Sequence, residues 1–114
     1  MKKIIVLFVF LFVGPVQVGS AWSDWDVIDK LIVGSTGHLY VYTHQAGINP
    51  NACSIASRYI LPNDHVVFER IYSAILSAFY AGKELQFSIL DNVCLGGSNP
   101  QIHNIQVRKG ATVN

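Results

Sequence analysis

The sequence lacks a strong charge of either sign. Its 114 residues hold eight Lys and Arg against seven Asp and Glu, for a formal net charge of +1 with histidine neutral. Such a chain has no electrostatic drive toward a phosphate backbone and no polybasic segment for anionic lipid. Repeats and low-complexity stretches are absent too. We therefore expect one domain, without nucleic-acid binding.

The motifs that mark catalytic and metal sites are also missing. The four histidines are scattered, and none stands at a metal-ligating spacing such as H-E-x-x-H. No G-x-S-x-G elbow is present to expose a nucleophilic serine. Asp24, Asp26 and Asp29 could bind a cation, but a solvated acidic edge explains them more simply. We expect a non-enzymatic protein without a metal or cofactor; a small hydrolase is the weaker alternative.

One long apolar run is present, at the start of the chain. It covers residues 4–13 and follows the basic start Met1-Lys2-Lys3, a pairing typical of a secretory signal peptide. The run is too short to span a membrane as a helix, which takes about 20 residues, so a retained anchor is the weaker alternative. Small residues predict cleavage after Ala21, with cleavage after Ser20 as the alternative. We expect residues 1–21 to be removed, leaving no stable membrane anchor.

Cleavage would leave a mature chain in the periplasm or outside the cell. Removal of two leader lysines changes its net charge to −1, which is still near neutral. We expect one domain over residues 22–109 and a flexible tail over residues 110–114.

Cysteine is scarce, because the chain holds only Cys53 and Cys94. In a small exported domain an even number of cysteines predicts a disulfide. A bridge enclosing about 40 residues would stabilise the domain by on the order of 3–4 kcal/mol in the chain-entropy model. Two buried free thiols and a metal site are the alternatives.

Hydrophobic patterning predicts five strands and one helix. The predicted strands cover residues 25–33, 38–44, 53–61, 84–90 and 102–108. The helix is predicted over residues 65–81, because apolar residues recur there at helical spacing. Asn63 or Asp64 would cap its start, and Gly82 would take the left-handed position after its last turn.

The order of three strands, a helix and two strands matches the five-stranded OB-fold barrel. The helix would plug one end of the barrel. The first strand is apolar on both faces, which favours a long coiled strand that closes the barrel. The alternative is an α+β open sheet with the helix packed on it.

Three segments carry a resemblance to a known family. They are the hairpin strand Val27-Ile28-x-x-Leu31-x-Val33-Gly34, the helix end at 77–83 (Ser-Ala-Phe-Tyr-Ala-Gly-Lys) and the ending at 94–102 (Cys-Leu-Gly-Gly-Ser-Asn-Pro-Gln-Ile). Together they resemble the B subunits of subtilase-cytotoxin and typhoid-toxin type, and small exported proteins of Gram-negative bacteria. The resemblance implies an OB-fold, a ring-shaped homo-oligomer and glycan binding.

Two departures limit what the resemblance implies. The strand at 38–43 has no cysteine, whereas those B subunits carry one in the second strand. Asp24 stands where those proteins have a serine important for sialic-acid binding, and its charge would repel a carboxylate. The fold therefore carries over as an expectation, and sialoglycan recognition does not.

Aromatic and amide side chains are the candidate ligand-binding residues. Aromatic rings stack on the apolar faces of sugars or fill protein interfaces. Trp25 could instead pack the end of the barrel. We expect an exported binding module for a glycan or a protein partner; a periplasmic structural or accessory protein is the alternative. The candidate residues are Trp22, Trp25, Tyr40, Tyr42, Asn92 and Asn99.

Overall fold

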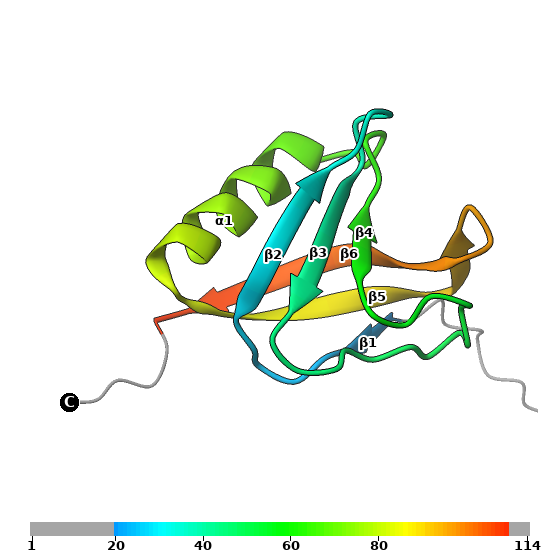
Figure 1. The fold of residues 1–114 in the computed structure, drawn as a ribbon, viewed down its shortest axis with the longest axis horizontal. Helices are drawn as coiled ribbons and strands as arrows, with labels where there is room; N and C mark the ends of the chain where they lie inside the picture. The colour runs from blue at the N-terminus through cyan, green and yellow to red at the C-terminus, as the bar shows by residue number, and fades with distance from the viewer. Residues whose placement is uncertain (1–19, 110–114) are drawn as a thin grey trace, which may run out of the picture.

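The computed structural model describes residues 20–109, which form one helix and one six-stranded sheet (Figure 1). Residues 1–19 of the predicted signal peptide (1–21) and the predicted tail at 110–114 lie outside the described residues, whereas Ser20 and Ala21 lie in the first strand of the sheet. The elements are β1 (Ser20–Trp22), β2 (Ile28–Val33), β3 (Leu39–Thr43), β4 (Tyr59–Leu61), α1 (Phe68–Ala81), β5 (Glu84–Leu95) and β6 (Asn99–Arg108). Across the sheet the strand order is β1-β5-β6-β4-β3-β2.

The sheet is open and mixed. Only the β4–β6 pair is parallel, and the edge strands β1 and β2 do not pair with each other in the described residues. The predicted closed five-stranded barrel is therefore wrong, and the alternative of an open sheet with one helix fits. The first predicted strand, at residues 25–33, is wrong at its start, because β2 begins only at Ile28. Residues 23–27 leave the line of β2, and Asp26 pairs with Leu85 of β5 instead.

Asp26 is the physical cause of this break. Its carboxylate accepts hydrogen bonds from the backbone N–H of Val27 at 2.8 Å and of Gln45 at 2.7 Å. A side chain that bonds nearby backbone groups competes with regular strand pairing. The chain therefore bends at this point, and it passes directly from one edge of the sheet to the other.

The core lies between the two halves of this curved sheet and α1. In Figure 1, β2, β3 and β4 cross in front of β5 and β6, and α1 lies beside β2 at one end. Every element except β1 contributes to the buried apolar cluster. Its members are Ile28, Leu39, Val41, Tyr59, Leu61, Ile71, Ile75, Ala78, Leu85, Phe87, Ile89 and Ile102.

The predicted strands also differ in length from the observed ones, and β6 begins at Asn99 instead of the predicted residue 102. The strand expected at 53–61 shrinks to β4, because the side chain of Asn49 bonds the backbone of Cys53 and holds a loop there. The strand expected to end at residue 90 continues as β5 to Leu95. Two glycines with positive φ, Gly96 and Gly97, then turn the chain directly into β6.

The helix ends as predicted and begins later than predicted. Gly82 adopts a left-handed φ of 67° and caps the last turn. The predicted caps Asn63 and Asp64 are wrong, because the N-cap is Val67 and no side chain caps it. Instead the Nδ1 atom of His65 accepts a hydrogen bond from the Val67 N–H at 3.1 Å. Helix α1 is neither long nor apolar enough to cross a membrane.

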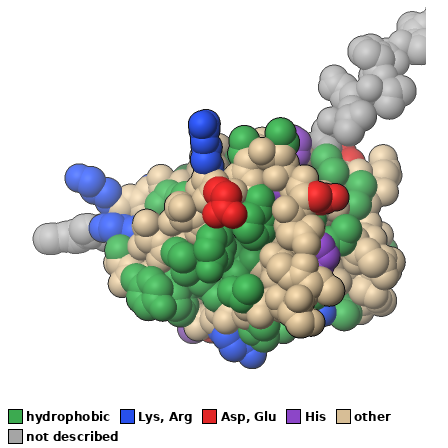
Figure 2. Space-filling view, turned by 90° about the horizontal axis from the view of Figure 1, so that it is seen from above, with side chains coloured by type: hydrophobic (Ala, Val, Ile, Leu, Met, Phe, Trp, Pro, Cys, Tyr) green, Lys and Arg blue, Asp and Glu red, His purple; other side chains and the backbone are tan. Residues whose placement is uncertain are grey.

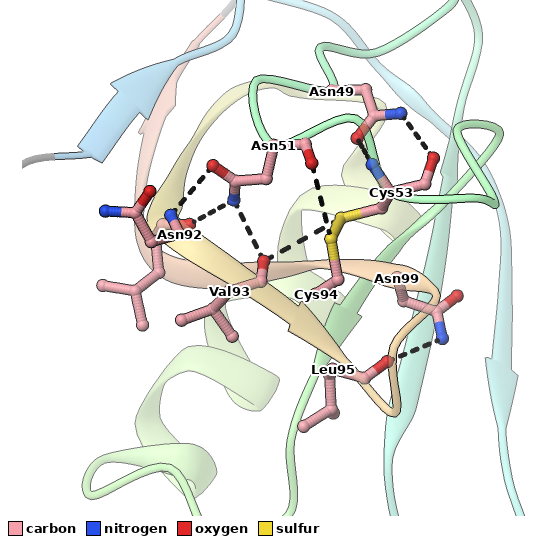
Figure 3. The surroundings of a disulfide bond; sticks show 9 residues. Asn49, Asn51, Cys53, Asn92, Val93, Cys94, Leu95 and Asn99 are labelled. Atoms are coloured by element: carbon pink, nitrogen blue, oxygen red, sulfur yellow. Dashed lines mark hydrogen bonds between the residues drawn. A yellow bond between two sulfur atoms is a disulfide. The ribbon is translucent and has the colours of Figure 1, made fainter.

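The predicted disulfide between Cys53 and Cys94 is present (Figure 3). Their Cα atoms lie 5.6 Å apart across a sequence separation of 41. The bridge ties the loop before β4 to the end of β5. A disulfide fits an oxidising compartment outside the cytoplasm.

Candidate functional site: a tyrosine–arginine face

The outward side of β3 presents two tyrosines. Leu39 and Val41 point into the core, so Tyr40 and Tyr42 lie on the opposite side of the strand and stay partly exposed. Lys30 of β2 pairs in register with Tyr42. The alternation therefore confirms the predicted outward position of both rings.

Arg58 lies between these two rings. Its Cζ atom is 4.3 Å from the centroid of the Tyr40 ring, and its Nη1 donates a hydrogen bond to the Tyr42 hydroxyl at 3.1 Å. Its Nε donates to Oδ1 of Asn99 at 3.0 Å. These groups come from β3, from the residue before β4, and from the first residue of β6.

Lys30 extends the cluster. Its Nζ atom lies 4.3 Å from the centroid of the Tyr42 ring. The ring quadrupole attracts a cation that lies over an aromatic face, and this attraction stabilises an exposed pair by about 0.5–1 kcal/mol. We name this cluster the tyrosine–arginine face. It consists of Lys30, Tyr40, Tyr42, Arg58 and Asn99.

The tyrosine–arginine face carries positive charge without a carboxylate. The two ion pairs among residues 20–109 join His44 to Asp29 and Arg108 to Glu84, so neither involves Arg58 or Lys30. Arg58 is partly buried, and its contacts are with neutral groups. The face therefore has an unneutralised cation that is partly shielded from water.

In a second arginine–aromatic pair, a carboxylate neutralises the charge of the arginine. The Cζ atom of Arg108 lies 4.3 Å from the centroid of the Trp25 ring. The same guanidinium makes an ion pair with Glu84 at 2.7 Å. Trp25 is thus covered by an arginine whose charge is already neutralised.

The structure brings together three of the six predicted ligand-binding residues. Tyr40, Tyr42 and Asn99 meet at Arg58, whereas Trp25 belongs to the Arg108 pair just described. Trp22 and Asn92 lie elsewhere, on β1 and within β5, and both are exposed. That these six residues bind a ligand stays a prediction.

Sequence reasoning did not select Arg58 or Lys30. A signal for Arg58 was present, because it is a charged residue directly before Tyr59, and strand alternation directs it to the side opposite that buried ring. Its contact with Asn99 could not be predicted, since the two residues are 41 positions apart in the sequence.

A small pocket lies at the bend between β1 and β2. Its cavity volume is about 50 Å³, and Asp24, Trp25 and the ring of Tyr59 are among its walls. This volume suits a few water molecules and not a sugar ring. Burial raises the pKa of the Tyr59 hydroxyl, which therefore stays protonated.

Among residues 20–109, no group of three or more His, Cys, Asp or Glu side chains could hold a metal ion. Comparisons with protein-family models, curated proteins and solved structures find no match to this chain. The resemblance to toxin B subunits therefore stays a prediction.

Proposed function

We propose that this protein is an exported, non-enzymatic binding module that recognises a carbohydrate through the tyrosine–arginine face. One observation carries the proposal. Two partly exposed tyrosines and an arginine are held together on the outward side of the sheet, by contacts of 3.1 Å and 4.3 Å.

The chemistry of the face suits a sugar. Tyrosine rings offer flat apolar surface for the C–H face of a pyranose, and their hydroxyls accept and donate hydrogen bonds. Arg58 adds N–H donors for sugar oxygens. Because Asn99 and Tyr42 already fix its guanidinium, less side-chain freedom is lost on binding.

Strand connectivity supports a relationship to the OB-fold, as a partly open form and not a closed barrel. With β1 and β2 counted as one bent strand, the order is three strands, a helix and a hairpin. OB-folds bind oligosaccharides on the face of their second and third strands. Tyr40 and Tyr42 lie on the second strand by this count, and Arg58 directly precedes the third.

Glycan-array binding of the secreted protein tests the proposal. We expect Tyr40→Ala and Tyr42→Ala each to weaken binding about tenfold or more, because each removes a stacking ring. Tyr80→Ala is the matched control, since Tyr80 is 82% exposed and lies on α1 outside the face. Thermal unfolding checks that each variant folds. Absence of glycan binding, or an equal loss in the control, would contradict the proposal.

A protein partner is the second candidate, for a periplasmic accessory role. The edge strand β2 exposes Ile32 and Val33, the latter by 62%. Figure 2, viewed from above Figure 1, shows hydrophobic side chains gathered on the upper side of the molecule. An open strand edge with apolar side chains can accept a strand from another chain. Val33→Lys would weaken such a contact, and light scattering or capture of one dominant periplasmic protein would reveal it.

A further inference from the structure

We infer that the sugar bound at the tyrosine–arginine face is acidic and that its carboxylate is recognised by Arg58. This inference rests on the proposed function and adds the chemical class of the ligand.

Within residues 20–109, Arg58 keeps N–H groups that bond no protein acceptor. A guanidinium has five N–H donors. Within residues 20–109, its Nε bonds Asn99 and its Nη1 bonds Tyr42, while Nη2 has no protein acceptor. The outer edge formed by Nη1 and Nη2 therefore keeps donors for a ligand. A planar pair of N–H donors matches the two oxygens of a carboxylate.

The charge of Arg58 also points to an anionic ligand. A partly buried cation loses hydration, and a countercharge normally compensates for that loss. Arg108 has this compensation from Glu84 at 2.7 Å. Arg58 lacks it among the described residues, although it is more shielded from water than the exposed Arg108. An anionic ligand would supply the missing charge.

The surroundings of the Arg58 guanidinium favour a sugar as the carrier of this carboxylate. The Tyr40 ring lies against one side of Arg58, and Lys30 places a second positive charge over the neighbouring Tyr42 ring. A ligand that combines a pyranose ring with a carboxylate would use both the aromatic surface and the charge. In a uronic-acid polysaccharide, each acidic sugar unit combines a pyranose ring with a carboxylate.

The test compares acidic polysaccharides with their own carboxyl-reduced forms. Polygalacturonate, alginate and hyaluronan are each titrated into the secreted protein before and after reduction of the carboxylates to alcohols. We expect binding of at least one acidic polymer, and about a tenfold or greater loss of affinity after its reduction. Added salt should weaken binding of the acidic form only.

Variants assign the effect to Arg58. Arg58→Gln should lower affinity for the acidic polymer to the level of the reduced one. Arg58→Lys should restore only part of it, because lysine keeps the charge and loses the planar pair of donors. Arg70→Gln is the matched control, since Arg70 is an exposed arginine of α1, and it should bind like the unchanged protein.

Each outcome decides between the two proposals. Equal affinity for acidic and reduced polymers, unchanged in Arg58→Gln, overturns the acidic ligand and leaves the carbohydrate-binding function standing. No binding to any polymer or array glycan overturns both. Equal binding to poly-glutamate overturns the sugar and points to an acidic protein partner. Should Arg58→Gln fail to fold, Arg58→Lys and the reduction experiment on the unchanged protein still decide.

Discussion

Tyr59 places a hydroxyl inside an apolar core. Its ring centroid lies 5.0 Å from that of Phe87, and the residue is only 2% exposed. The hydroxyl accepts a hydrogen bond from the Ile48 N–H at 2.8 Å. Gly47 permits this arrangement, because a Cβ atom there would overlap the hydroxyl. Burial raises the pKa of Tyr59, since a phenolate in the core would lose its hydration.

Tyr59→Phe should therefore change both stability and its pH dependence. At neutral pH the loss of the acceptor for Ile48 should cost about 1–2 kcal/mol. In the unchanged protein, unfolded Tyr59 releases its proton above about pH 10 while the folded residue keeps it, so stability falls as pH rises further. Urea unfolding between pH 8 and 11 should show a smaller decline in the variant. Tyr80→Phe, which removes an exposed hydroxyl, is the control, and equal slopes for all three proteins would contradict the prediction.

Residue-level prediction from sequence succeeded where the pattern is local. Alternation alone places Leu39 and Val41 inside and Tyr40 and Tyr42 outside, because successive strand residues face opposite sides. It could not report that Arg58 lies on Tyr40 or that Arg108 covers Trp25, since such contacts depend on which strands become neighbours. The candidate site was thus predictable as outward aromatic residues, without the cation between them.

At the scale of elements, Asn51 explains why β5 is longer than its sequence indicates. Residues 91–92, Asp-Asn, have the composition of a turn, and Asn92 indeed has a positive φ of 62°. The Asn51 side chain bridges this irregularity. It donates to the carbonyls of Leu90 at 2.8 Å and Val93 at 3.0 Å, and it accepts from the Asn92 N–H at 2.9 Å (Figure 3). No local pattern predicts a partner about 40 residues away.

Asn51→Ala should accordingly loosen the end of β5. Three backbone groups would lose their partner, and the free energy of unfolding should fall by about 2 kcal/mol. Hydrogen exchange should become faster at the Asn92 amide. Asn104→Ala, at an exposed position of β6, is the matched control and should change stability by no more than about 0.5 kcal/mol. Equal effects of the two substitutions would show that Asn51 is not a structural bridge.

For the whole molecule, the sequence predicts the order of the elements correctly, but it does not predict that the sheet stays open instead of closing into a barrel. The helix does lie between the third and fourth predicted strands, and the meander of β2, β3 and β4 precedes it. The strand that the sequence did not predict is β1, which pairs with β5 across more than 60 residues. Residues 25–33 look like one strand because apolar side chains fall on both faces. Asp26 breaks it through backbone contacts that only the folded chain brings together.

The disulfide is the remaining long-range tie, and its removal tests how the whole molecule depends on it. The Cys53→Ala and Cys94→Ala double variant avoids a leftover thiol. With a sequence separation of 41 between the two positions, the chain-entropy model predicts a loss of about 3–4 kcal/mol. For a domain of this size that lowers Tm by roughly 12–30 °C, measured by thermal unfolding, and the unchanged protein should match it under reducing conditions.

The same double variant separates stability from binding. The Ile55 N–H donates to the Ser98 carbonyl at 2.9 Å, and Arg58 is held by Asn99 and Tyr42, so the tyrosine–arginine face has ties that do not involve sulfur. Well below its Tm, the variant should keep its carbohydrate affinity within about threefold, a difference below 1 kcal/mol. A large loss of affinity in a folded variant would mean that the bridge positions Arg58. An unchanged Tm would mean that hydrogen bonds through Asn49 and Asn51 already hold the loop, because they restrain the same residues.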